Sequence, residues 1–274
     1  MGSAGRVLPL QKGIVYGPVA SRRLGRSLGI NLMPTTYKAC SYNCVYCHYG
    51  WTKVAVLDGR PLYQDLPTVE QVGAALRAAL EAGANPEYIT FSGNGEPTLH
   101  PAFSDMVDTV IWCRDQLAPQ AKTCVLSNAT CLGKESAARA LEKLDVRILK
   151  LDAGDEQTWR LVNRPAPGLS FVQLLEGLRS TKNWVLQTLF CDGPYANCRP
   201  HQVEQWMELV GQLRPRLVQI YTIDRPAAHG RLRRVPLEVL KEIGAKASRR
   251  TGLPVHVYGA NGQSWHFVSK AAAK

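Results

Sequence analysis

Long apolar runs are missing from this sequence of 274 residues: none reaches the roughly 18 residues that a membrane-spanning helix needs. The first residues, Met1–Arg6, also lack the apolar core of a secretory signal. We see no internal repeat, no low-complexity tract and no linker, and the length suits one α/β domain. These absences predict a cytoplasmic protein with a single domain over residues 1–274.

Cysteine is scarce for a disulfide scaffold, with eight in the chain. The usual spacing of a zinc site is missing as well, because such sites pair a C-x2-C with a second ligand pair about 12–20 residues downstream. After Cys47 the sequence offers only His48 nearby, and the next cysteine is Cys113. A structural zinc site therefore stays a weaker alternative for the cysteines that do cluster.

Three cysteines do cluster, in the run Lys38–His48. Cys40, Cys44 and Cys47 have the spacing C-x3-C-x2-C. Three thiolates on one loop can bind a cubane [4Fe–4S] cluster, which is normally held by four cysteines. One iron would then lack a protein ligand, and an open iron can bind a small chelating molecule. The loop therefore indicates a catalytic cluster.

The loop resembles the signature of the radical S-adenosylmethionine (SAM) superfamily, C-x3-C-x-aromatic-C, with Tyr46 as the aromatic residue. The segment Phe91–Pro97 resembles the glycine-rich "GGEP" segment of that superfamily. The upstream stretch Val15–Asn31 is similar to a branch of iron–sulfur oxidoreductases grouped with the wyosine-type tRNA base-modifying enzymes. The resemblance runs from about Tyr16 to about Tyr258.

Strand-like and helix-like segments alternate along the chain, which predicts parallel strands joined by right-handed crossovers. A capping box at Thr68 and Gln71 opens the first predicted helix. The resemblance implies the same architecture, an α/β fold with a partial (β/α)6 TIM-like barrel. The expected strands are 27–32, 88–92, 123–127, 146–151, 184–190 and 217–223, with a final edge strand at 254–258. The expected helices are 68–82, 102–116, 134–144, 156–162, 170–179, 200–213 and 236–249.

The resemblance also implies a reaction. The cofactors are a [4Fe–4S] cluster and SAM, and an electron from the reduced cluster cleaves SAM to a 5′-deoxyadenosyl radical. That radical abstracts hydrogen from a substrate. The electron comes from an external donor such as flavodoxin or ferredoxin.

The site residues follow by position, since reacting groups of such barrels lie at the carboxyl ends of the strands. Tyr46 corresponds to the aromatic near the adenine, and Tyr221 approaches the same base. Packing is the alternative for both tyrosines, as a polar turn is for Ser127 and Asn128. The cluster ligands are Cys40, Cys44 and Cys47, and the expected SAM contacts are Tyr46, Gly93, Asn94, Gly95, Glu96, Ser127, Asn128, Asp152, Gln187 and Tyr221. Asn94 stands where the family has its second glycine, and Lys150, two residues before Asp152, has no assigned role.

The remaining cysteines have no place in this set. Cys113, Cys124 and Cys131 are expected to be reduced core thiols, since free cysteine is often buried. Cys191 and Cys198 flank a predicted loop at the barrel rim. Three options stay open for this pair: a metal site, a thiol that quenches a substrate radical, or no role.

The charge of the chain bears on the substrate. Thirty-three Lys and Arg against 22 Asp and Glu give a net charge of +11. A basic surface attracts tRNA or a small phosphorylated metabolite, although a solvated surface without a partner fits equally well. Wyosine synthase has extra cysteines before its radical SAM loop, and this chain has none before Cys40. A zinc-stabilised RNA-binding protein without catalysis is the alternative function.

Overall fold

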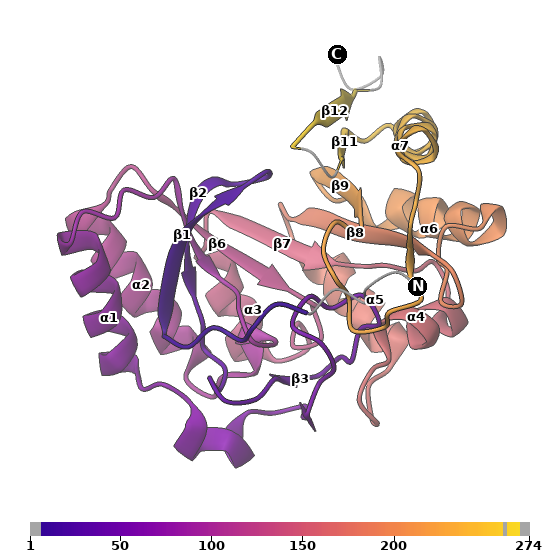
Figure 1. The fold of residues 1–274 in the computed structure, drawn as a ribbon. Helices are drawn as coiled ribbons and strands as arrows, with labels where there is room; N and C mark the ends of the chain where they lie inside the picture. The colour runs from indigo at the N-terminus through magenta and orange to yellow at the C-terminus, as the bar shows by residue number, and fades with distance from the viewer. Residues whose placement is uncertain (1–6, 260–261, 269–274) are drawn as a thin grey trace. The chain divides into compact units, whose positions relative to one another are not determined.

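The computed structural model describes residues 7–259 and 262–268 (Figure 1). The chain clusters into two compact units. The N-terminal unit comprises Pro9–Ser41 and Thr52–Ile148; the C-terminal unit comprises Met1–Leu8, Tyr42–Trp51 and Leu149–Lys274. Compactness of a unit does not show that it folds independently, so the single domain expected from the sequence stays a prediction.

Four strands form the sheet of the N-terminal unit. Strands β2 (Gly25–Ile30), β5 (Tyr88–Phe91) and β6 (Lys122–Ser127) are parallel neighbours. Strand β1 (Val15–Ser21) pairs antiparallel with β2, and the sequence analysis missed it. Residues 17–20 are exposed, so β1 lacks the buried apolar pattern that identifies a strand in a sequence.

Three α-helices accompany these strands: α1 (Val69–Glu81), α2 (Phe103–Leu117) and α3 (Glu135–Glu142). Helix α1 packs on α2, and α2 packs on α3 (Figure 1). Two short 3₁₀ turns precede α1 and α2, at Arg60–Asp65 and Pro97–Leu99.

The capping box predicted for α1 is confirmed. The Thr68 hydroxyl accepts the Gln71 amide at 3.3 Å, and the Gln71 side chain accepts the Thr68 amide at 2.9 Å. Two otherwise unpaired amides at the helix start are thereby satisfied. The buried face of α1 begins one residue later, at Val72, and continues through Leu76 and Leu80.

The C-terminal unit has its own run of parallel strands. Strands β8 (Val185–Asp192), β9 (Leu217–Thr222) and β11 (Val255–Tyr258) are parallel neighbours. Strand β10 (Arg233–Arg234) pairs with the end of β8. Strand β7 (Val146–Lys150) spans the boundary between the two units in sequence.

Strand β11 was expected to be an edge strand, and this prediction was wrong. Strand β12 (Ser264–Phe267) pairs antiparallel with β11. The sequence holds a signal for this hairpin in Asn261-Gly262, a pair that suits tight turns, and Gly262 has a positive φ of 76°. The exposed alternate residues of β12 make it hard to detect from apolar pattern alone.

Four helices complete the C-terminal unit: α4 (Glu156–Asn163), α5 (Phe171–Ser180), α6 (Pro200–Leu213) and α7 (Leu237–Thr251). Trp206 of α6 is 1% exposed; it packs edge-on against Phe190 of β8 and donates to the Thr188 hydroxyl at 3.1 Å. The face of α6 that carries Trp206 therefore packs against β8. Of the helices formed by described residues, none combines the length and apolarity needed to span a membrane.

Removal of the α1 cap gives a stability test. We expect Thr68→Ala to lower the free energy of unfolding by about 1 kcal/mol, because two amides lose their side-chain partner. Thr68→Ser keeps the hydroxyl and should behave like the wild type. Urea unfolding followed by circular dichroism measures both; equal stability of the alanine and serine variants would contradict the role of the cap.

Candidate cofactor site

The cysteine loop passes from one unit to the other between Ser41 and Tyr42. Cys40 ends strand β3 (Ala39–Cys40), which pairs with β4 (Val54–Ala55), and it is buried. Cys44 and Cys47 are partly exposed, and the Cys47 amide donates to the Cys44 carbonyl at 3.1 Å. All three are free thiols, as a set of metal ligands must be before metal binds.

In the N-terminal unit, Asn128 lies directly against Cys40. Its Nδ2 is 3.6 Å from the Cys40 Sγ and donates to the Ser41 hydroxyl at 2.9 Å. Thr130 holds the other end of the amide, because its backbone N–H and its hydroxyl both donate to the Asn128 Oδ1. The Asn128 amide group is thus fixed with its N–H toward the sulfur.

Glu96 ties the ends of two strands together. Its carboxylate accepts hydrogen bonds from the Ser127 hydroxyl at 2.8 Å and from the Asn128 backbone N–H at 2.6 Å. The backbone N–H and the hydroxyl of Thr98 also donate to it. Burial raises the pKa of the Glu96 carboxyl, although these hydrogen bonds oppose the rise. Glu96 therefore positions Ser127 and Asn128. The hydrogen bonds described for its side chain go to these two residues and to Thr98, and none goes to a cysteine.

The glycines of the segment allow it to lie against β3 and β2. A methyl group on Gly95 would come 1.7 Å from the Ala39 carbonyl oxygen, and one on Gly93 would come 2.6 Å from the Asn31 Oδ1. Gly93 also has φ +128°, which side chains rarely adopt. Asn94 is fully buried, and its side chain bonds the Gln11 backbone and the Pro34 carbonyl. Its side chain holds the loop, which leaves the backbone of the segment as the part suited to a ligand.

In the C-terminal unit, the carboxylate of Asp152 joins the largest set of partners. It accepts the Tyr46 hydroxyl, the Asn163 amide at 2.8 Å and the Leu189 backbone amide at 2.8 Å. Lys150 Nζ lies 3.2 Å from its second oxygen. Asp152 follows β7, and Tyr46 lies in the cysteine loop, so this carboxylate fixes the loop to the end of a strand.

Lys150 is the positive member of this group. Its Nζ donates to the Tyr221 hydroxyl at 3.1 Å and lies 5.1 Å from the ring centroids of both Tyr46 and Tyr221. Burial alone would lower the pKa of this lysine, but the charge of Asp152 and the Tyr221 hydroxyl outweigh it and raise the pKa. Burial and the Asp152 charge likewise raise the pKa of Tyr46. The group therefore holds a lysine cation and a neutral tyrosine.

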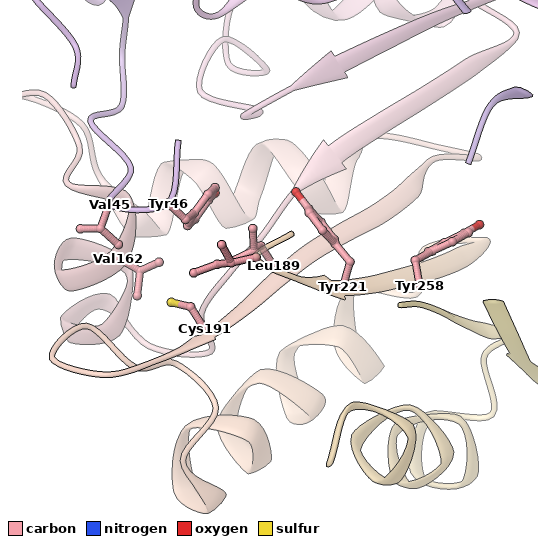
Figure 2. Close-up of a cluster of buried hydrophobic side chains, with 8 residues drawn as sticks. Val45, Tyr46, Val162, Leu189, Cys191, Tyr221 and Tyr258 are labelled. Atoms are coloured by element: carbon pink, nitrogen blue, oxygen red, sulfur yellow. The ribbon is translucent and has the colours of Figure 1, made fainter. Parts of the chain in front are cut away.

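An apolar cluster of described residues supports these polar groups (Figure 2). Tyr46 and Val45 enter it from the cysteine loop, and Tyr221 and Tyr258 enter it from neighbouring strands. Cys191 also belongs to this cluster, fully buried, and its Sγ lies 3.3 Å from the Tyr195 carbonyl. The members are Val45, Tyr46, Val162, Leu189, Cys191, Tyr221, Ile223 and Tyr258.

The structure thus gathers the predicted residues into two groups, one in each unit. Gly93, Asn94, Gly95, Glu96, Ser127 and Asn128 lie together with Cys40. The second group joins Tyr46, Asp152 and Tyr221 around Lys150. The Gln187 side chain donates to Gln219 of the neighbouring strand β9 at 3.1 Å.

Comparison with known proteins connects this geometry to a family. Residues 35–188 match the radical SAM superfamily. The chain belongs to that superfamily. The matched residues include the cysteine loop, the glycine-rich segment and Asp152. The expected fold, a mainly parallel α/β barrel of the radical SAM type, is confirmed, and the protein is a radical SAM enzyme.

Relatives at the sequence level cover most of this chain. A UPF0026 protein of Methanocaldococcus jannaschii is 30% identical over 84% of this chain and 70% of its own length. GTPase Obg of Brachyspira hyodysenteriae is 30% identical over 77% of this chain, which spans only 30% of that protein. The match covers less than a third of that protein, so its name describes that protein and not this chain.

Solved structures agree on the fold. A radical SAM methyltransferase from Sphaerobacter thermophilus superimposes with a TM-score of 0.61 at 19% identity, covering 85% of this chain and 66% of that one. TYW1 with a lysine–pyruvate adduct bound has a TM-score of 0.57 at 14% identity, covering 90% and 81%. SuiB of Streptococcus suis bound to S-adenosylmethionine has a TM-score of 0.54 at 13% identity, covering 86% and 59%.

The cofactors of this superfamily are a [4Fe–4S] cluster and SAM, and the residues present fit both. Two asparagine amides approach cysteine sulfurs: Asn128 at Cys40 and Asn163 at Cys44, the latter at 3.5 Å. N–H donors directed at sulfur favour thiolate over thiol, as cluster ligation requires. Among the described residues, the buried Asn163 Oδ1 lacks a hydrogen-bond partner, which suits a donor from a bound ligand.

Asn163 was missed by the sequence analysis, and Lys150 had no assigned role. Asn163 ends α4, far from the motifs, and bonds Cys44, Tyr46 and Asp152 at once. Only its place before the turn at Arg164-Pro165 marks it in the sequence. Its role depends on a tertiary contact between α4 and the cysteine loop, where the Val45 and Val162 backbones are hydrogen-bonded.

Gly95→Ala tests the close approach of the glycine-rich segment to β3. We expect overpacking to cost about 1–3 kcal/mol in stability. Because Gly95 faces Ala39, next to Cys40, we also expect less iron to be retained after anaerobic reconstitution. Gly133→Ala is the control, since a methyl group there meets nothing within 4 Å. Equal iron content in both variants would contradict the packing account.

Lys150→Met tests the buried charge pair. Asp152 then lacks its cationic partner, and we expect the free energy of unfolding to fall by about 3 kcal/mol at pH 7. The pKa of Lys150 is raised by folding, so its stabilisation is fully present below the pKa of an unfolded lysine, about 10.4, and is lost as the pH rises further. The stability difference between wild type and variant should therefore be constant from about pH 7 to 10 and shrink above that range.

The control for this variant is Lys143→Met, which removes an exposed lysine paired with Asp108. Surface pairs of this kind contribute about 0–1 kcal/mol. Chemical unfolding over the pH series measures both variants, and a Lys150→Met effect no larger than the control would contradict the pairing with Asp152.

Proposed function

We propose that this enzyme cleaves SAM reductively at a [4Fe–4S] cluster held by Cys40, Cys44 and Cys47. When bound, the cluster supplies the electron, and SAM supplies the 5′-deoxyadenosyl group that removes a hydrogen atom from the substrate. The observation that carries the proposal is the fixation of the cysteine loop: Asn163 bonds Cys44 and Tyr46, and Asp152 bonds both Asn163 and Tyr46.

The protein's own residues bind and orient SAM in this proposal. The backbone of Gly93–Glu96 receives the methionine amino group, with Glu96 as a positioning residue for Ser127 and Asn128. The group around Asp152 receives the polar part of the nucleoside, and the unpaired Asn163 Oδ1 accepts a hydrogen bond from it. Tyr46 and Tyr221 give the adenine an aromatic, water-excluding wall, since both are buried.

The proposed substrate is a base in tRNA or a small phosphorylated metabolite, because the net charge of +11 attracts polyanions. The likeness to TYW1 is one of fold, at 14% identity. The wyosine reaction is therefore not part of the proposal.

A cytoplasmic location and an external electron donor, flavodoxin or ferredoxin, belong to the same proposal. All eight cysteines are free thiols within the described residues, which suits a reducing compartment. A zinc-stabilised RNA-binding protein is disfavoured by the geometry: residues 7–259 and 262–268 contain no group of three Cys, His, Asp or Glu side chains arranged for one metal ion. A cubane spreads its ligands over several irons and has no such requirement.

Cluster content and SAM cleavage test the proposal together. Anaerobically reconstituted protein should be brown, hold about four irons per chain, and release methionine and 5′-deoxyadenosine from SAM when dithionite is added. Replacing any of Cys40, Cys44 or Cys47 by alanine should abolish both products. Cys113→Ala is the matched control, because this thiol is buried beside Gly73 and should leave iron and cleavage unchanged. A colourless, zinc-containing wild type would refute the proposal.

A further inference from the structure

Residues 224–232, a loop of the C-terminal unit, are hydrogen-bonded to the backbone of the cysteine loop. Residues 224–232 follow β9, and their Ala228 and His229 amides donate to the carbonyls of Cys47 and Val45 at 3.0 and 2.9 Å. His48 adds an ion pair with Asp224, with 3.6 Å between Nε2 and Oδ1. Three separate contacts therefore fix this loop on the side of Val45 and Cys47 where their carbonyls point.

An exposed tryptophan lies on the same side. Trp51 follows Cys47 by four residues and is 40% exposed, although large aromatic side chains are usually buried. The His229 ring meets it edge-on at 6.2 Å, and the Arg164 guanidinium lies over it at 5.1 Å from the ring centroid. His229 is supported in turn by Tyr195 at 4.6 Å. We call Trp51, Arg164 and His229 the Trp51 platform.

The loop that carries His229 is strongly basic. Residues 224–234 contain four arginines and one acidic residue, Asp224, which is engaged by His48. All four arginines are exposed: Arg225, Arg231, Arg233 and Arg234. Asp192 faces this cluster and pairs with Arg233 at 2.9 Å, so the acidic groups that face the loop neutralise only part of its charge.

We propose that the Trp51 platform and the arginines of residues 224–234 are the docking surface for an acidic electron-carrier protein that reduces the cluster. The inference rests on the proposed function, which requires an electron from outside. A partly exposed tryptophan with an arginine stacked over it, next to a loop rich in exposed arginine, has the composition of a binding hot spot. Charge attraction with a small contact area is typical of transient electron-transfer partners.

The position of the platform favours an electron carrier over tRNA. A reductant must approach the cluster ligands themselves, and the platform is bonded to the backbone at Val45 and Cys47. The side chain of Tyr46 enters the buried cluster of Figure 2, and Ala227 and Leu232 of the loop pack against the same cluster. The arginines of the loop stay exposed, so a protein partner can reach them beside the cysteine loop.

A protein carrier and a small chemical reductant together distinguish a defect in docking from a defect in SAM cleavage. In the full-length, reconstituted enzyme, 5′-deoxyadenosine formation is driven by reduced flavodoxin, by reduced ferredoxin, or by dithionite, which needs no docking site. We expect Trp51→Ala, and separately Arg225→Glu with Arg231→Glu, to lower the carrier-driven kcat/KM about tenfold while the dithionite-driven rate stays within about twofold. The wild-type carrier-driven rate should fall as salt increases.

The matched control is Arg179→Glu with Arg249→Glu. It makes the same change in net charge at exposed positions of α5 and α7 and should leave the carrier-driven rate unchanged. Iron content identifies any variant that fails to fold; the exposed arginine pair keeps the test valid if Trp51→Ala loses its cluster.

Several results would overturn the inference. In one, both variants show the same carrier-driven rate as the wild-type enzyme. In another, neither flavodoxin nor ferredoxin reduces the wild-type enzyme at low salt. Another is an arginine variant that loses binding of bulk tRNA, measured by fluorescence anisotropy, yet accepts electrons normally, which would make the surface an RNA site. A wild type that makes no 5′-deoxyadenosine with dithionite would instead show that the proposed function itself has failed.

Discussion

The buried pair of Lys150 and Asp152 is the interaction on which the C-terminal half of the site depends. A lone buried carboxylate is costly, and so is a lone buried ammonium, but each lowers the cost of the other. Once Asp152 is ionised there, it orders Tyr46, Asn163 and the Leu189 amide as its donors. Two of these donors reach the cysteine loop, so the position of that loop depends on an ion pair at the end of β7.

In the N-terminal unit, the carboxylate of Glu96 orders the residues around Cys40 in a similar way. Glu96 gathers donors from Thr98, Ser127 and Asn128, and Asn128 then points its amide at Cys40. In both halves a buried acid positions an asparagine, and the asparagine contacts a cysteine sulfur. Hydrogen bonds to cluster sulfurs influence reduction potential. Under the proposed ligation by Cys40 and Cys44, these two amides would connect the packing of the strand ends to redox chemistry.

Sequence patterns predicted the parts of this arrangement that are local. Three such parts are the cysteine spacing, Gly93 and Gly95, and the capping box at Thr68. Each depends on residues only a few positions apart, so a short stretch of sequence is enough to predict it. The parallel strands were also predicted closely, because buried apolar runs alternate with amphipathic helices. Strands β1 and β12 were missed, since both are antiparallel and partly exposed.

Long-range contacts could not be predicted in this way. Asn163 reaches Asp152 and the cysteine loop only because α4 packs there, and no pattern near residue 163 indicates it. The sequence likewise did not reveal that residues 224–232 would be hydrogen-bonded to the cysteine loop, where His229 meets Trp51. Asn94 replaces a family glycine, and its buried side chain explains how the loop accommodates it.

The central claim is that three thiolates leave one iron of the cluster open for SAM. Electron paramagnetic resonance of the reduced protein, with and without SAM labelled at its amino nitrogen and carboxylate oxygens, tests this most directly. The account predicts that SAM alters the cluster signal and that the labelled atoms couple to it. An unaltered signal, or a fourth protein ligand on the same cluster, would contradict it.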